Sequence, residues 1–240
     1  MLEGALALAH SVPSPNSLAF ALVFSALLHQ QLRQPDQTRE AAEECLAICD
    51  EHGVPSERLW VTTAYGWSLA ELGHVEEGLE RLREALDAQR AGGGEIAGPQ
   101  FISHLAAVQL HLGNAEEALK AVEDGLETSR RTGNAFYDAE LWRQRGEVMK
   151  LQGDSAEAHR SFQTAIAVAR RQSAKSLELR AATSLARLWR EEGRSYEAHR
   201  LLQQVFGWFR EGFDTADLRD AASLLEELTS SAGSGVGAAR

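Results

Sequence analysis

The chain has 240 residues, of which 44% are hydrophobic and 25% are charged, a balance typical of a folded protein. Its formal net charge of −11 argues against nucleic-acid binding, because neutralising phosphates requires a surplus of Lys and Arg. The two cysteines form no disulfide framework, and no apolar run approaches the roughly 18 residues of a membrane helix, so we expect a cytoplasmic protein away from membranes.

The first residues follow a short helical pattern. Leu2, Ala5, Leu6 and Ala9 recur at helical spacing, and a turn containing prolines follows up to Asn16. In a chain built from repeated pairs of helices, this is the pattern expected where the second helix of one pair ends and a linker leads to the next pair. Residues 1–16 are therefore interpreted as the remnant of a preceding repeat and its linker.

The first long helix is expected at about residues 17–33 and is apolar on nearly every side. A repeat array normally closes with a polar-faced helix, because an uncapped end exposes apolar surface, and this helix cannot serve as that cap. We therefore expect the chain to be an excised piece that covers this face by self-association. The alternative is that residues 1–16 fold back as a lid. The residues expected in the face are Leu18, Phe20, Val23 and Phe24.

An internal repeat with a period of 40 residues follows. Each copy has the form Gly-x-x-x-Glu-small, with a small residue seven positions before the glycine and a large apolar residue nine positions after it. Glycine ends a helix readily because it adopts the left-handed conformation without steric cost. The pattern therefore predicts stacked pairs of antiparallel helices. The four turn glycines are Gly73, Gly113, Gly153 and Gly193.

The register predicts five helix pairs and a closing helix. The pairs are 17–33 with 38–51, 56–72 with 75–90, 97–112 with 115–131, 135–152 with 155–171, and 174–192 with 195–210. The closing helix is expected at 217–228, and the Gly/Ser/Ala-rich residues 230–240 are expected to form a flexible tail. The glycine-rich residues 92–98 are expected to be a flexible connection, because no lysine follows to make a phosphate loop.

The small, turn and apolar residues recur at equivalent positions, or columns, of the repeats. In this pattern residues 17–229 resemble the tetratricopeptide-repeat family. The resemblance implies an all-α fold, a right-handed superhelix of antiparallel helix pairs with about five repeats and a closing helix. It also implies a module that binds proteins or peptides and has no catalytic site of its own. The period of 40 exceeds the 34 residues usual in the family, so longer helices or connections are expected.

Four segments carry a narrower resemblance. They begin at Ser17, Gly66, Ala174 and Gly207, and the most specific is Gly207–Leu218. They resemble the C-terminal repeats of large bacterial signalling proteins, in which an adenylate/guanylate cyclase domain and a nucleotide-binding ATPase domain precede such repeats. The resemblance implies a regulatory segment of a nucleotide-signalling protein. Nothing in the sequence resembles the cyclase or ATPase domains themselves.

The search for chemistry gives few candidates. Cys45, Cys49 and His52 share one helical stretch, but a fourth metal ligand would have to come from elsewhere, and Cys often serves as a small buried hydrophobe. The eight histidines form no metal-binding or acid–base motif. We therefore expect no catalytic residue, cofactor or metal. The alternatives are an enzyme with the cyclase or ATPase activity of the parent, and a sensor whose groove holds a small ligand.

The resemblance places a binding groove on the first helices of the pairs, where residues at i, i+3, i+7 and i+10 share one stripe. Two tryptophans lie in one repeat, and cations gather in the later ones. This combination suits an extended peptide with an acidic segment. The alternative is that the tryptophans pack internally and the arginines pair with neighbouring glutamates. The candidate groove residues are Trp60, Trp67, Arg143, Lys150, Arg180, Arg187 and Arg190.

Overall fold

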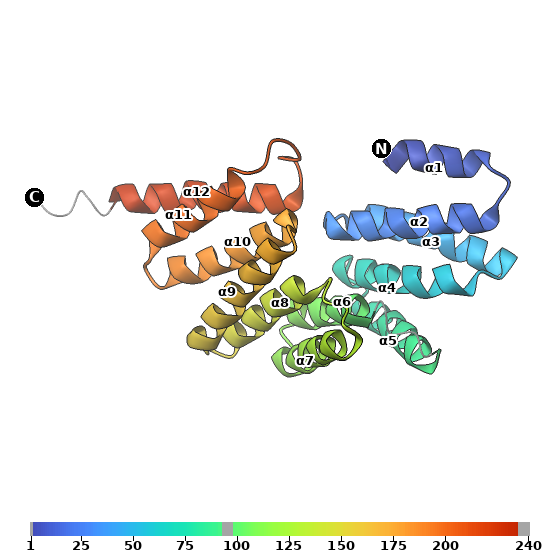
Figure 1. Cartoon of the computed structure of the whole chain (residues 1–240), viewed down its shortest axis with the longest axis horizontal. Coiled ribbons are helices and arrows are strands. Elements are labelled where there is room, and N and C mark those ends of the chain that lie inside the picture. The colour runs from blue at the N-terminus through green and yellow to red at the C-terminus, as the bar shows by residue number, and fades with distance from the viewer. Residues whose placement is uncertain (1, 93–97, 235–240) are drawn as a thin grey trace, which may run out of the picture. The chain divides into compact units, whose positions relative to one another are not determined.

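The computed structural model describes residues 2–92 and 98–234, with side chains for residues 4–92 and 98–230. Within these ranges the regular structure is entirely helical, which confirms the predicted all-α fold of antiparallel helix pairs. The helices divide into two compact units, residues 1–112 and 113–240 (Figure 1). No helix in the described ranges is long and apolar enough to cross a membrane.

The first unit contains six helices. They are α1 (Leu2–Ser11), α2 (Pro15–Gln31), α3 (Pro35–His52), α4 (Pro55–Glu71), α5 (Val75–Ala91) and α6 (Gly98–His111). Consecutive helices pack in pairs, and α2 also packs on α4 and α4 on α6. The first helices of successive repeats therefore form one layer, and α3 and α5 form the other. Proline at the start of α2, α3 and α4 favours helix initiation, because the first helical residues need no N–H partner within the helix.

The second unit repeats this arrangement. Its helices are α7 (Ala115–Thr132), α8 (Asp138–Leu151), α9 (Ser155–Arg171), α10 (Lys175–Glu191), α11 (Ser195–Phe206) and α12 (Ala216–Ser234). Helix α8 pairs with α9 and α10 with α11, while α8, α10 and α12 pack on one another in order (Figure 1). The closing helix α12 therefore extends the layer of first helices.

Among the described residues, left-handed residues recur at the turns every 20 positions from Arg33 to Gly193, with position 93 outside the described ranges. The sequence predicted only the glycine turns after the first helices. Two turns use other residues, Arg33 (φ 58°) and Ser173 (φ 55°). The hydrogen bond from Gln34 N–H to the His29 carbonyl (2.9 Å) closes the first of these in the pattern of a Schellman motif. The left-handed residues at this interval are Arg33, Gly53, Gly73, Gly113, Gly133, Gly153, Ser173 and Gly193.

The backbones of α4 and α5 approach closely at Gly66 on α4 and Gly78 on α5. A Cβ added to Gly78 would lie 2.5 Å from the Gly66 carbonyl oxygen, and one added to Gly66 would lie 2.8 Å from that of Gly78. In this repeat the small residues seven positions before the turn and five positions after it therefore allow backbone contact, whereas a Cβ added to Gly146 would meet the Phe162 ring. Large side chains such as Phe101 and Phe162, both fully buried, fill the remaining core.

Several predicted boundaries were wrong. Helix α8 begins at Asp138, because the Asn134 side chain accepts a hydrogen bond from Phe136 N–H (3.3 Å) and forms a turn instead. Helix α11 ends at Phe206, four residues early, and α12 runs to Ser234, so residues 230–234 of the expected tail are helical. The rest of that tail, 235–240, and residues 93–97 of the expected flexible connection lie outside the described residues.

Candidate functional site

Two of the expected groove cations lie inside an ionic network of the second unit. Arg143 on α8 donates to Glu140 at 2.6 Å and to Glu147 at 3.1 Å. Burial opposes the charge of Arg143, but the two carboxylates outweigh it and hold its pKa above the ordinary value. Arg180 on α10 donates to Asp217 on α12 at 2.6 Å, and each side chain is 15% exposed. Arg143 is therefore neutralised within α8, whereas Arg180 ties α10 to α12, and both offer little surface to a partner.

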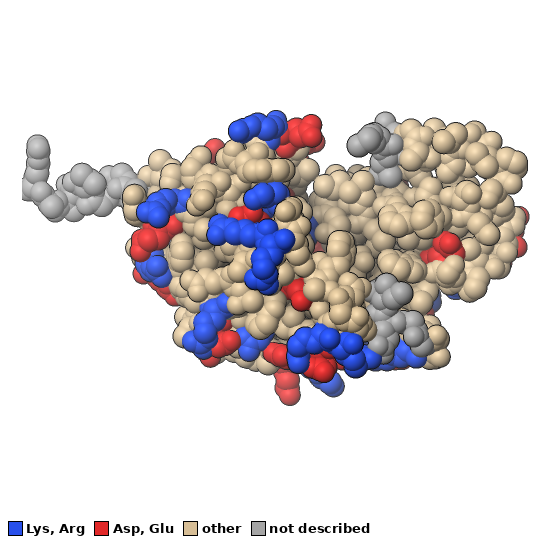
Figure 2. All heavy atoms as spheres, in the orientation of Figure 1, with Lys and Arg blue, Asp and Glu red and all other residues tan. Residues whose placement is uncertain are grey.

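Three other cations of the stripe keep an accessible side. The side chains of Lys150, Arg187 and Arg190 are 30%, 43% and 35% exposed. Arg187 and Arg190 lie one turn apart on α10, and Figure 2 shows basic side chains gathered in this region with acidic ones beside them. Each cation has an acidic neighbour: Glu191 at 2.6 Å from Lys150, Asp220 at 3.6 Å from Arg187, and Glu227 beside Arg190.

The stripe of the second unit is therefore not a free basic surface. All five of its cations pair with acidic neighbours, which is the alternative that the sequence analysis left open. Three of the partners, Asp217, Asp220 and Glu227, belong to α12, so the closing helix supplies negative charge to the arginines of α10. Sequence spacing within one repeat could not show this, because the partners lie more than 30 residues away.

The two tryptophans of the first unit lie in different environments. Trp67, predicted to line the groove, is 5% exposed and packs in a core cluster with Ala70, Leu82 and Val108, so it offers little surface to a partner. It fills the space between α4 and α6, which the stripe pattern alone does not reveal. Trp60 is half-buried, with its ring edge-on to Phe101 at a centroid distance of 5.5 Å. Trp60 alone remains partly accessible.

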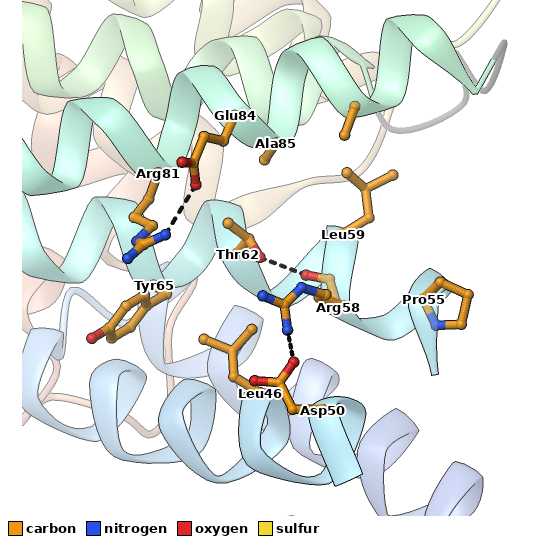
Figure 3. Close-up of a pocket in the computed structure, with 11 residues that line it drawn as sticks. Leu46, Asp50, Pro55, Arg58, Leu59, Thr62, Tyr65, Arg81, Glu84 and Ala85 are labelled. Atoms are coloured by element: carbon orange, nitrogen blue, oxygen red, sulfur yellow. Dashed lines mark hydrogen bonds and ion pairs between the residues drawn. The ribbon is translucent and has the colours of Figure 1, made fainter. Parts of the chain in front are cut away.

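A pocket of about 420 Å³ opens on the other side of the first unit, between α3, α4 and α5 (Figure 3). Its floor is apolar, with Leu46, Leu59 and Ala85 among the lining residues. Two ion pairs flank it, Arg58 with Asp50 and Arg81 with Glu84 (3.0 Å). The sequence analysis did not find this pocket, because its residues come from three helices and form no local motif.

The pocket offers an amphipathic environment. The Tyr65 ring lines it, and burial raises the pKa of the phenol above its ordinary value, so the hydroxyl stays a neutral donor at physiological pH. Two guanidinium groups and this hydroxyl could orient a small anionic or polar group over the apolar floor.

Cys45 and Cys49, considered from the sequence as metal ligands, are both buried on α3. The Cys45 thiol donates to the Ala19 carbonyl on α2 at 3.4 Å. Burial raises the pKa of both thiols, which disfavours the thiolate that a metal would need. Among the described residues no three His, Cys, Asp or Glu side chains are grouped to hold a metal ion.

Comparison with known proteins supports one class of repeat. A family model described as tetratricopeptide repeat matches residues 100–171, and one described as anaphase-promoting complex subunit 5 matches residues 8–69. No curated protein matches the chain by sequence. The family model and the helix pairs together support a repeat scaffold of the tetratricopeptide type.

Solved structures show the same fold. A tetratricopeptide-repeat protein of Thermus thermophilus is 20% identical, with a TM-score of 0.61, over 86% of this chain and 98% of its own. BtubC of P. vanneervenii is 16% identical, with a TM-score of 0.59, over 100% and 89%. A signal-transduction ATPase of Pyrococcus horikoshii with a tetratricopeptide-repeat sensor is 11% identical, with a TM-score of 0.57, over 92% of this chain and 34% of its own. At these identities the likeness concerns the fold alone.

Proposed function

We propose that the chain is a non-catalytic scaffold that binds a partner protein along α8, α10 and α12 through an acidic segment of that partner. The observation that carries this proposal is the row of accessible cations, Lys150, Arg187 and Arg190, on the layer of first helices. Scaffolds of this fold generally bind proteins or peptides on such layers. The setting proposed for it is the cytoplasm, where its two cysteines stay reduced.

The geometry of these cations favours exchange of ion pairs with a partner. A guanidinium carries five N–H donors, and the pair between Arg187 and Asp220, at 3.6 Å, is long for a hydrogen bond. Surface pairs of this kind contribute only about 0–1 kcal/mol each, so a carboxylate of the partner can replace them at little cost. The side chains are also already oriented by their neighbours, which lowers the entropy lost on binding.

Site-specific photo-crosslinking in source cells tests this proposal. A photoreactive residue in place of Arg187 is expected to capture a partner, whereas the same residue in place of Arg200, exposed on α11, is expected to capture none or far less. Equal capture at both positions, or capture at position 200 alone, would count against a binding surface on the first helices.

A larger context is part of the proposal: the scaffold regulates a bacterial nucleotide-signalling protein with cyclase or ATPase domains. The observation behind it is the resemblance of Gly207–Leu218, which follows α11 and forms the connection and the start of α12. An antibody raised against the purified chain tests it. We expect a band in source cells well above 26.2 kDa, and a band at that mass alone would contradict the proposal.

The pocket between α3, α4 and α5 supports a second candidate, a sensor for a small amphipathic ligand. Its specific basis is the pairing of an apolar floor with Tyr65, Arg58 and Arg81. Native mass spectrometry of the purified chain should show a bound small molecule that is lost in Arg81→Ala and kept in the control Arg83→Ala, an exposed position outside the pocket lining. A ligand-free mass from the source organism would remove this candidate.

A further inference from the structure

Helix α2 presents an apolar face to solvent. The side chains of Phe20, Phe24 and Leu28 are 57%, 52% and 42% exposed, and their spacing of four residues places them on one side of the helix. The two phenylalanine rings are in contact, with centroids 4.8 Å apart. Large apolar side chains that lie exposed side by side, rather than singly, are typical of an interaction site.

The 40-residue repeat allows this face of α2 to be compared with the same positions in the later first helices. The positions equivalent to Phe24 and Leu28 are almost completely buried, at 5% exposure or less, in the three later repeats whose preceding first helix belongs to the same unit. These positions are Ala64, His104 and Ser184 for Phe24, and Ser68, Val108 and Leu188 for Leu28.

In each of those repeats the preceding first helix is packed against the helix that carries these positions: α2 on α4, α4 on α6, and α8 on α10. The Ser184 side chain shows that this position faces the preceding first helix, because its hydroxyl donates to Glu147 on α8 at 2.5 Å. The Phe24–Leu28 face of α2 is therefore the surface on which a first helix receives another first helix. Among the described helices, α2 packs only on α1, α3 and α4.

Helix α1 does not close this face. It packs on α2 and brings Leu6 to the core cluster of the first unit, yet Phe20 and Phe24 stay exposed. Two other residues expected in the face are elsewhere: Val23 is 4% exposed and Leu18 packs partly buried against the same core cluster. The predicted face was thus correct for the two phenylalanines and wrong for Val23.

Charge favours a second copy of α2 as the occupant. No Asp, Glu, Lys or Arg occurs between residues 4 and 32, and Figure 2 shows the surface over α1 and α2 almost without charged side chains. Two such faces meet without desolvating a charge. Helix α12 would make a poor partner, because its exposed residues include Arg219, Glu226 and Glu227. A head-to-tail contact with α12 would bury these charges against phenylalanine.

We propose that two copies of the chain associate through α2, with Phe20, Phe24 and Leu28 of one copy packed on the same residues of the other across a two-fold axis. Each copy then supplies the first helix that the other receives. Such a contact is self-complementary and closes at two copies. The dimer concerns the 240-residue chain itself and is separate from the partner surface on α8, α10 and α12, so either proposal can fail without the other.

Light scattering coupled to size exclusion, over a concentration series of the full chain, tests this dimer. The mass is expected to rise from 26.2 kDa towards twice that value and no further, with little effect of salt because the contact is apolar. The variant F20S/F24S should dissociate about tenfold or more readily, because each phenylalanine loses its buried contact. The control Phe136→Ser removes a phenylalanine that is 71% exposed in the second unit and should dimerise like the unchanged chain.

A cross-linking measurement fixes the geometry. In the variant Leu28→Cys a short bismaleimide should join two copies through this cysteine, because the native Cys45 and Cys49 are buried. Circular dichroism confirms that the variants stay helical. A chain that remains monomeric at every concentration, a dimer unaffected by F20S/F24S, or a mass that climbs beyond two copies would each overturn the proposal.

Discussion

The guanidinium of Arg180 on α10 and the carboxylate of Asp217 on α12 lie 2.6 Å apart, and the two residues are separated by 37 positions in the sequence. The hydrogen bond from Ser184 on α10 to Glu147 on α8 spans the same 37 positions. Helix α12 therefore lies on α10 in the way that α10 lies on α8. The closing helix occupies the place of a further first helix, and its carboxylates neutralise the arginines of the last repeat.

Removal of this carboxylate should loosen α12 specifically. Asp217→Ala removes one carboxylate partner of Arg180 in a mostly buried place, where breaking an ion pair costs roughly 1–3 kcal/mol once residual exposure is allowed for. Hydrogen exchange is expected to accelerate in α12 before it does in α8, because repeats depend on their immediate neighbours. Uniform acceleration along the chain, or none, would show that the pair does not hold the closing helix.

At the close approach of Gly66 and Gly78, we expect a Gly-to-Ala substitution to destabilise the protein although alanine has the higher helix propensity. Gly78→Ala should stabilise α5 by about 1 kcal/mol if propensity alone decided the outcome. The added Cβ would lie 2.5 Å from the Gly66 carbonyl oxygen and 2.8 Å from the Ala70 nitrogen, both backbone atoms, so we expect a net loss of unfolding free energy.

Urea denaturation measures this loss. The control is Gly4→Ala in α1, where no atom lies within 4 Å of the added Cβ and the change should be neutral or stabilising. A Gly78→Ala variant more stable than the unchanged chain would mean that α4 and α5 separate easily at this point.

The acid dependence of stability should include a contribution from Glu178. Burial of this carboxyl opposes its ionisation, but hydrogen bonds from Arg170 (2.7 Å) and Lys175 (2.8 Å) outweigh it and lower its pKa below the ordinary 4.5. Because the folded-state pKa is lowered, the stabilisation is complete above the unfolded-state value and is lost as pH falls through the folded-state one. The stability difference between the unchanged chain and Glu178→Gln should therefore shrink as pH falls below 4.5. A difference that is constant with pH would assign Glu178 a packing role only.

The helix pairs could be predicted from sequence because the small, turn and apolar columns repeat at one period. Arg33 escaped recognition because the turn there uses a residue with a side chain, held by the bond from Gln34 to His29. The register nevertheless continues through the first repeat: Ala26, Thr38 and Cys45 occupy the columns of Gly66, Gly78 and Ala85, and all three are buried.

The site was less predictable than the fold, because a stripe on one helix does not reveal what faces it. Trp60 and Trp67 share a stripe, yet Val108 on α6 covers Trp67 and leaves Trp60 half-exposed. Arg187 was placed on the correct helix, but its partner Asp220 lies on α12, beyond any local pattern. Contacts between repeats decide these outcomes, and spacing within a repeat cannot supply them.

Partner binding at Arg187 and Arg190 is tested most directly by titrating the partner captured at position 187 against three forms of the chain. R187Q/R190Q should bind about tenfold more weakly and with less salt dependence, because charge-assisted contacts are lost. D220N/E227Q removes the competing carboxylates of α12 and should bind more tightly than the unchanged chain. Both variants loosen α12, so equal effects of the same sign, or no effect of either, would show that these arginines serve only to hold the closing helix and would contradict the proposed binding surface.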